Sequence, residues 1–129
     1  MNLIHKDLTN KIIKPFYDVY NELGHGFLEK VYQNALFIEL KNRGFYVEAQ
    51  KQIKVYYKNH QVGEYYADLI IDEVVVLELK ATEVIIKEFE FQLINYLKAT
   101  EIEVGLLLNF GVQPEFKRKV FSNKHHASL

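Results

Sequence analysis

Hydrophobic residues follow two different periods along the chain, which predict helices at its start and strands in its middle. Apolar positions recur at helical spacing over about residues 9–23, 27–43 and 86–99. The segments between them are rich in β-branched and aromatic residues, which is typical of strands. These strand segments are residues 45–47 with 53–57, then 62–71, 74–80 and 102–109. Because turn residues separate the middle segments, we expect a meander of antiparallel hairpins there.

The connections between these segments predict a mixed sheet. A helix that crosses between two buried strands implies that the strands at 74–80 and 102–109 run parallel, with a right-handed connection. The expected order is therefore αα-βββ-α-β, an α/β (α+β mixed sheet) fold in a single domain over residues 1–129. Pro15 lies inside the first helical pattern, where it would kink the helix or mark a later start.

The expected core covers about residues 9–112, and a short basic tail follows Pro114. We expect this tail to be frayed at its end. Its basic residues are Lys117, Arg118, Lys119, Lys124, His125 and His126.

Composition agrees with one globular domain and narrows its chemistry. Hydrophobic residues make up 49% of the 129-residue chain and charged residues 26%. The 16 basic and 17 acidic residues leave a net charge of −1, so net charge does not imply attraction to nucleic acid. The absence of cysteine excludes disulfides, thiolate zinc sites and cysteine nucleophiles. No apolar run has the length of a membrane span or signal peptide, so we expect a cytoplasmic protein without a membrane partner.

The strand at 74–80 is apolar until it ends in a carboxylate and an ammonium group. Glu78 and Lys80 share one face because side chains alternate along a strand. Asp68 on the preceding strand lies opposite Glu78 if the hairpin loop has an odd number of residues. Two such carboxylates repel each other unless a cation lies between them. Oxygen ligands suit Mg²⁺ or Mn²⁺, and a nearby lysine can hold the attacking water or stabilise charge on a phosphate.

Each of these residues also has a simpler interpretation. A lone Glu-x-Lys pair is commonly a solvated strand face or a salt bridge. Glu29 lies in the first turn of a helix, where the helix dipole favours an acidic residue. Gln92 and Tyr96 are four residues apart on one helical face and can simply form a hydrogen-bonding pair.

Two further residues are candidates for a supporting role. We expect Tyr32 to be a packed aromatic residue whose hydroxyl supports a neighbour. We expect Gly26 chiefly to permit a tight turn between the first two helices, and the weaker alternative is that it lets a phosphate approach the helix start.

Five blocks of sequence, in order, resemble the bacterial GxxExxY proteins, which belong to the PD-(D/E)XK nuclease superfamily. The resemblance extends from about residue 12 to residue 111, nearly the whole chain. The blocks are GFLEKVY at 26–32, GEYYAD at 63–68, LELKA at 77–81, QLINYL at 92–97 and GLLLNFG at 105–111.

This resemblance implies a restriction-endonuclease-like core with a central mixed sheet flanked by helices. Asp68 and Glu78 correspond to the metal-binding carboxylates, and Lys80 corresponds to the catalytic lysine. Glu29 corresponds to an additional acidic residue from an early helix, which would act on the metal directly or through water. Gln92 corresponds to the polar residue on the helix after the lysine strand, and would orient the lysine, a ligated water or a phosphate.

We therefore expect a nuclease that uses Mg²⁺ or Mn²⁺ to hydrolyse phosphodiester bonds of nucleic acid, DNA in preference to RNA. A homodimer would help so small a nuclease to engage duplex DNA. The alternative is a non-catalytic module that keeps the nuclease fold and binds nucleic acid or a protein. A third hypothesis is that Asp68, Glu78 and Lys80 form only a buried salt-bridge cluster.

Overall fold

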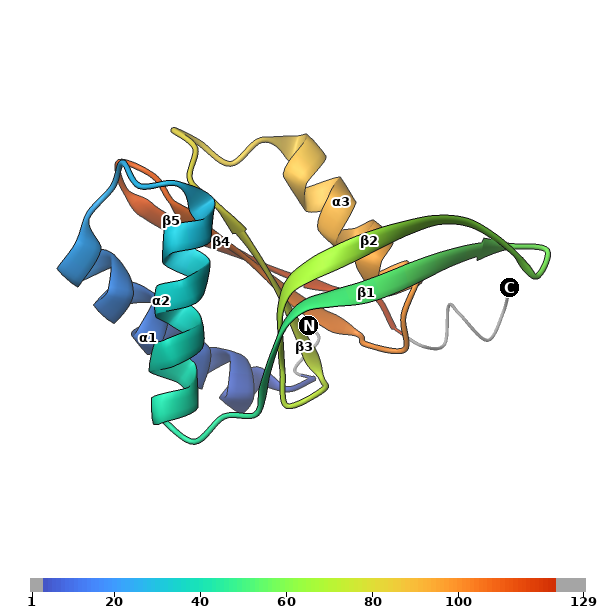
Figure 1. The fold of residues 1–129 in the computed structure, drawn as a ribbon, viewed down its shortest axis with the longest axis horizontal. Coiled ribbons are helices and arrows are strands. Elements are labelled where there is room, and N and C mark those ends of the chain that lie inside the picture. The colour runs from blue at the N-terminus through green and yellow to red at the C-terminus, as the bar shows by residue number, and fades with distance from the viewer. Residues whose placement is uncertain (1–3, 123–129) are drawn as a thin grey trace.

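The computed structural model describes residues 4–122, and in this range the chain forms one mixed sheet with helices on both of its faces (Figure 1). The fold class expected from the sequence is thereby confirmed. Lys124, His125 and His126 of the expected basic tail lie outside the described residues. The elements in chain order are α1 (Lys6–Leu23), α2 (Glu29–Asn42), β1 (Val47–Tyr57), β2 (His60–Ile71), β3 (Val75–Lys80), α3 (Lys87–Lys98), β4 (Val104–Phe110) and β5 (Pro114–Val120).

The sheet has the strand order β1-β2-β3-β4-β5. Strands β3 and β4 run parallel, as predicted, and the other neighbouring pairs are antiparallel. Helix α3 forms the connection between the two parallel strands. Figure 1 shows the β1–β2 hairpin extending well beyond the rest of the sheet, past one end of α3.

Tight turns set the register of the hairpins. Lys58 and Asn59 both have positive φ, 49° and 67°, as the central residues of a type I′ turn require. Asp72 and Glu73 repeat this pattern with φ of 52° and 63°. Ile71 pairs with Val75, so three residues form the second loop. This odd number is the condition under which Asp68 lies opposite Glu78.

Two apolar cores occupy the two faces of the sheet. Leu77 and Leu79 of β3 pack with α1 and α2, whereas Val76 packs with α3. Each fully buried leucine or phenylalanine stabilises the fold by about 1.5–3 kcal/mol. Gly105 lets α3 approach β4 closely, since a Cβ there would lie 2.7 Å from Leu93 Cδ1. Strand β3 is therefore covered on both sides, which explains its almost uninterrupted apolar sequence.

The segment expected to be a basic tail is instead a strand. Pro114–Val120 forms β5, which pairs with β4 along its whole length, so the sheet extends beyond the expected core limit of residue 112. Lys119 Nζ forms an ion pair with Glu90 of α3 at 2.5 Å. Charged side chains are common on edge strands, and this is why the sequence of β5 resembles a tail.

The structure also changes the bounds of the predicted helices. Helix α1 begins at Lys6, so Pro15 lies within it, and of the two alternatives for this residue the later start is excluded. Helix α2 begins at Glu29 and buries Tyr32, Gln33, Leu36 and Leu40. Its apolar residues Val31 and Ile38 are exposed.

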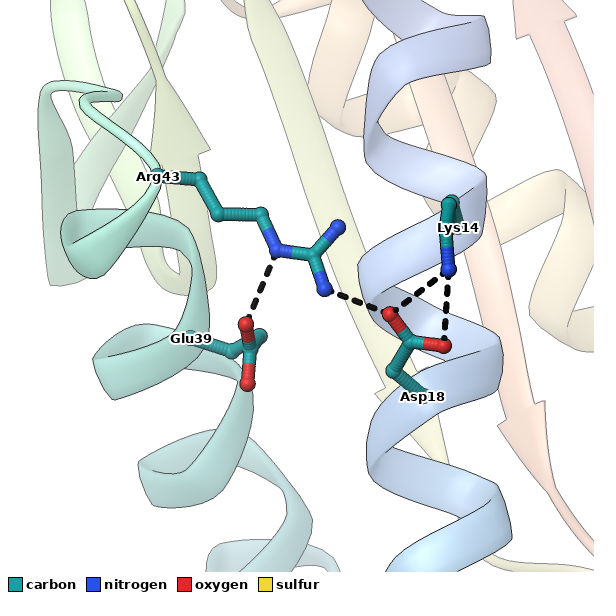
Figure 2. A network of polar contacts seen from close by, with 4 residues as sticks. All are labelled: Lys14, Asp18, Glu39 and Arg43. Carbon is teal, nitrogen blue, oxygen red and sulfur yellow. Dashed lines mark hydrogen bonds and ion pairs between the residues drawn. The ribbon is translucent and has the colours of Figure 1, made fainter.

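A polar network fixes α2 against α1 (Figure 2). Arg43, at the end of α2, donates from Nε to Glu39 at 2.8 Å and from Nη2 to Asp18 of α1. Lys14 contacts the same Asp18 carboxylate at 3.2 Å. Arg43 and Lys14 together hold the pKa of Asp18 below its usual value. The network therefore orients the helix that carries Glu29.

The carboxyl-terminal ends of β3 and β4 are held together by the loop that follows β3. Asn109 of β4 is fully buried and accepts a hydrogen bond from the Thr82 N–H at 3.0 Å. It also donates to the Thr82 carbonyl at 2.9 Å. Gly111 packs against the same carbonyl, with which a Cβ would overlap. The Tyr20 hydroxyl of α1 donates to the Gly111 carbonyl at 2.8 Å.

Substituting Gly111 by alanine tests this close packing. We expect Gly111→Ala to lower the free energy of unfolding by about 1–3 kcal/mol, because the backbone must move to accept the new methyl group. Urea denaturation measures the change. Gly63→Ala is the matched control, since no atom lies within 4 Å of a Cβ there. Equal stability of the two variants would contradict the packing described for Gly111.

Candidate active site

The central strand β3 presents its polar residues to α3. Leu77 and Leu79 face the α1–α2 layer, and Val76 faces α3. By alternation Glu78 and Lys80 also belong to the α3 face, as the sequence predicts. Glu78 is nevertheless almost fully enclosed, with 6% of its surface exposed. A buried carboxylate thus lies in the middle of an apolar sheet.

Strands β2 and β3 separate where the two carboxylates meet. Their regular pairing extends from Ile71–Val75 to Leu69–Leu77 and then stops. Beyond this point the Asp68 N–H donates to Glu78 Oε2 at 2.9 Å. In return, the Leu79 N–H donates to Asp68 Oδ2 at 2.8 Å. The two side chains therefore replace the missing strand pairing, and each carboxylate reaches the main chain of the opposite strand.

A distortion of β2 accounts for this position of Asp68. Leu69 packs into the α1–α2 core, yet Ala67, two residues earlier, packs into the α3 core. In a regular strand such residues share a face. The partner strand β1 is distorted at the same place, where Gln50 has a φ of 54° and the Gln50–Asp68 pair is missing from the register. Gln50 Nε2 donates to Gln33 Oε1 of α2 at 2.8 Å, which anchors the distortion.

The enclosed pair has unfavourable electrostatics. Burial raises the pKa of Glu78 to about 8, and the nearby Asp68 carboxylate contributes in the same direction. The Asp68 N–H and the Lys80 charge lower this pKa, but they are outweighed. The two carboxylates thus repel each other in a site that only partly stabilises their charge.

Lys80 does not neutralise the carboxylates by direct pairing. Its Nζ lies 4.6 Å from the centroid of the Phe89 ring of α3. The ion pairs found among residues 4–122 include none of Asp68, Glu78 and Lys80. The hypothesis of a buried salt-bridge cluster is therefore wrong for this structure.

Helix α3 forms the wall opposite β3. Tyr96 is buried, and it packs in the core on the face of β3 that carries Glu78. Burial, followed by the charge of Glu78, raises the pKa of Tyr96 well above its usual value. Gln92 lies one turn earlier on α3 and is half-buried. Its position between Phe89 and Tyr96 along the helix places it on the wall that faces Lys80 and Glu78.

Glu29, the site residue expected from the second helix, does not join the carboxylate pair. Glu29 is the exposed first residue of α2. Among residues 4–122, no three His, Cys, Asp or Glu side chains are grouped so that they could hold a metal ion. Asp68 and Glu78 are thus together, and Glu29 is not a third direct ligand in this arrangement.

Tyr32 and Gly26 shape the loop before Glu29. The Tyr32 ring stacks on Phe110 with centroids 4.3 Å apart, and its hydroxyl donates to the Gly24 carbonyl at 2.6 Å. It also accepts a hydrogen bond from the Phe27 N–H at 3.2 Å. Gly26 has a φ of 108°, which favours glycine. A cavity of about 150 Å³ lies between this loop and the loop after β3, lined by His25, Gly26, Ala81, Thr82, Glu83, Phe110, Gly111 and Val112.

Sequence reasoning missed three supporting contacts. Phe89 lies under the Lys80 ammonium, and Gln33 holds Gln50. Tyr65 packs at a tilt against Tyr96, with ring centroids 4.7 Å apart. Helical spacing alone could have indicated Phe89, because it precedes Gln92 by three residues. The other two contacts join residues far apart in the chain, and no local pattern indicates them.

Comparison with known families decides the assignment. A model described as the PD-(D/E)XK nuclease superfamily matches residues 6–119. The chain belongs to the PD-(D/E)XK nuclease superfamily. The match includes β5 up to residue 119, so the superfamily domain contains nearly all of the strand that was expected to be a tail.

Structural comparison finds a similar fold in a solved structure. The chain is similar to the crystal structure of SSO0001, with a TM-score of 0.60 and 18% sequence identity. The similarity covers 73% of this chain and 50% of that one, so this chain spans about half the length of that protein. No curated protein matches the sequence. In the part of the chain that the structure describes, none of the helices is long and apolar enough to cross a membrane.

The raised pKa of Glu78 makes stability depend on pH. Without divalent cations, the folded protein keeps the Glu78 proton up to about pH 8, whereas the unfolded chain loses it near the ordinary value of 4.5. Stability therefore falls as pH rises through this window. We expect Glu78→Gln to remove this loss of stability at high pH. Above pH 8 its free energy of unfolding should therefore exceed that of wild type by a few kcal/mol.

Urea denaturation in EDTA at pH 5 and pH 8.5 measures this difference. Glu22→Gln, which removes an exposed carboxylate from α1, controls for the loss of one acidic residue. If Glu78→Gln and wild type differ in unfolding free energy by the same amount at both pH values, the raised pKa of Glu78 is contradicted.

Proposed function

We propose that this superfamily member is a divalent-metal-dependent nuclease that hydrolyses phosphodiester bonds, with DNA as its preferred substrate. One observation carries the proposal. Asp68 and Glu78 are held against each other at the point where β2 and β3 separate, without a paired cationic side chain among residues 4–122. Such an arrangement is costly by itself and becomes favourable when a cation binds between the carboxylates.

The donor set supports Mg²⁺ or Mn²⁺. Both side chains offer hard oxygen ligands, and cysteine is absent from the chain. Mg²⁺ in phosphate-processing sites is commonly held by one or two carboxylates, with water and substrate oxygens completing its shell. The lack of a third direct protein ligand therefore fits this ion, and Glu29 would act through water. When bound, the metal supplies a Lewis acid and lowers the pKa of coordinated water.

Lys80 would act on the phosphate or on the attacking water. It lies two residues beyond Glu78 on the same strand face, and its ammonium is free of ion pairs with other described residues. The Phe89 ring restrains the ammonium without neutralising it. The positive charge of Lys80 can then offset the negative charge that develops as water attacks phosphorus and one P–O ester bond breaks.

Two residues of α3 would position these groups. Tyr96 packs on the face of β3 that carries Glu78, so its hydroxyl would restrict the orientation of that carboxylate. Gln92, one turn away on the same helix wall, would orient Lys80, a water molecule or a phosphate oxygen. Both are positioning roles, because neither side chain needs to bond to the reacting atoms.

Within the superfamily, we assign the chain to the GxxExxY proteins on the five ordered blocks of its sequence. The motif that names these proteins begins at Gly26 and includes Glu29 and Tyr32. The Tyr32 hydroxyl fixes the loop that leads to Glu29 at the start of α2, which supports a structural reason for this spacing. A homodimer and a cytoplasmic location stay predictions.

A cleavage assay tests the proposed activity. We expect a labelled DNA oligonucleotide to be cleaved in Mg²⁺ or Mn²⁺ and to stay intact in EDTA. Asp68→Asn, Glu78→Gln and Lys80→Met should each lower the rate by about 100-fold or more, because each removes a charge that acts in the transition state. Gel analysis of single-turnover reactions measures the rate.

Glu22→Gln is again the control, and it should retain wild-type cleavage because α1 lies on the other face of the sheet. Cleavage that survives all three site substitutions would refute the assignment of the site. A wild-type protein that binds DNA but leaves it intact in Mn²⁺ would instead identify a non-catalytic binding module.

A further inference from the structure

A groove lies between the β1–β2 hairpin and the second half of α3. It has a volume of about 510 Å³, which is in the range of ligand-binding sites. Its lining residues are Lys54, Val55, Tyr56, Tyr65, Asn95, Lys98 and Ala99. Its lining therefore comes from β1, β2 and the C-terminal end of α3. Figure 1 shows the β1–β2 hairpin extending past this end of α3.

An aromatic contact links this groove to the carboxylate pair. Tyr65 lines the groove and packs against Tyr96, with ring centroids 4.7 Å apart and ring planes tilted by 50°. Tyr96 in turn packs in the core on the face of β3 that carries Glu78. A ligand in the groove would therefore lie two side chains away from the proposed metal ligands.

The groove combines positive charge with an accessible aromatic surface. Its lining includes two lysines and no carboxylate. Tyr65 is 39% exposed despite its contact with Tyr96. The chain as a whole has a charge of −1, so this local surface differs in sign from the average of the molecule. Lysines beside an exposed aromatic ring are the combination that binds single-stranded nucleic acid.

We propose that this groove binds an unpaired nucleic-acid strand and directs it to the Asp68–Glu78 pair. The inference rests on the proposed nuclease function for its class of ligand. Lys98 contacts a backbone phosphate, Tyr65 offers a surface for base stacking, and Asn95 supplies a polar contact between them. The proposal adds a preference for unpaired strands, which the active site alone does not imply.

The shape of the groove favours an unpaired strand over a duplex. Stacking on Tyr65 requires a base whose face is accessible, and the bases of a duplex are already stacked on each other. Bases would stack irrespective of their identity, so we expect little sequence preference.

Binding to a fluorescein-labelled oligo-dT strand tests this proposal. Fluorescence anisotropy is measured with the full chain in EDTA, so neither metal binding nor cleavage affects the result. We expect the single strand to bind more tightly than a duplex of equal length. Lys98→Met should weaken binding about threefold or more and reduce the slope of log affinity against log salt by about 0.7, the loss of one phosphate contact.

Lys41→Met is the matched control. Lys41 and Lys98 each lie in the last turn of a helix with Nζ over a phenylalanine ring, at 5.4 Å and 5.6 Å from the centroid. Methionine keeps the packing on that ring and removes only the charge. Lys41 is on α2, in the layer on the opposite face of the sheet, so its substitution should leave the salt slope unchanged.

A second pair of variants tests stacking. Tyr65→Leu should weaken single-strand binding by at least about fivefold. Tyr57→Leu removes an exposed ring of the same hairpin that does not line the groove, and this variant should bind as wild type does.

Three outcomes would overturn the proposed groove. These are an equal loss of affinity in Lys98→Met and Lys41→Met, an equal loss of affinity in Tyr65→Leu and Tyr57→Leu, and tighter binding of the duplex than of the single strand. Selective binding of single strands by a protein without Mn²⁺-dependent cleavage would overturn the nuclease proposal and leave the groove in place.

Discussion

Two carboxylates that repel each other determine how the centre of this molecule is built. Asp68 and Glu78 occupy the gap where β2 and β3 stop pairing, and each accepts a main-chain N–H from the opposite strand. These hydrogen bonds keep the side chains in place although burial and mutual repulsion raise the pKa of Glu78. A site that is costly for the isolated protein is the expected result when binding an ion matters more than maximum stability.

The surrounding structure supports this pair from three directions. The distortion at Gln50, held by Gln33 of α2, brings Asp68 toward β3. Helix α3 packs Tyr96 on the face of β3 that carries Glu78, and it places the Phe89 ring under the Lys80 ammonium. Asn109 and Gly111 hold the loop that follows Lys80. Each support comes from a different element, so the site depends on the whole fold rather than on one strand.

The sequence predicted most of this architecture because its main signals are local. Alternation along β3 placed Glu78 and Lys80 on one face, but the predicted strand bounds left only residues 72 and 73 between β2 and β3. The loop in the structure has three residues, 72–74, and this odd number meets the condition under which Asp68 lies opposite Glu78. Sequence reasoning failed for β5, because an edge strand with basic side chains has the composition of a tail. It could not indicate the distortion at Gln50 or the Tyr65–Tyr96 contact, since both depend on contacts between distant segments. Family resemblance suggested Glu29 as a ligand, but the start of α2 leaves it exposed and outside the carboxylate pair.

The central claim is that Asp68 and Glu78 form a divalent-cation site. A crystal of the protein soaked in Mn²⁺ tests it most directly, by anomalous diffraction at the manganese absorption edge. The account predicts an anomalous peak within bonding distance of both carboxylates, and no peak there in a Glu78→Gln crystal soaked in the same way. A wild-type crystal without anomalous density between Asp68 and Glu78, at Mn²⁺ concentrations that occupy other carboxylates of the protein, would contradict it.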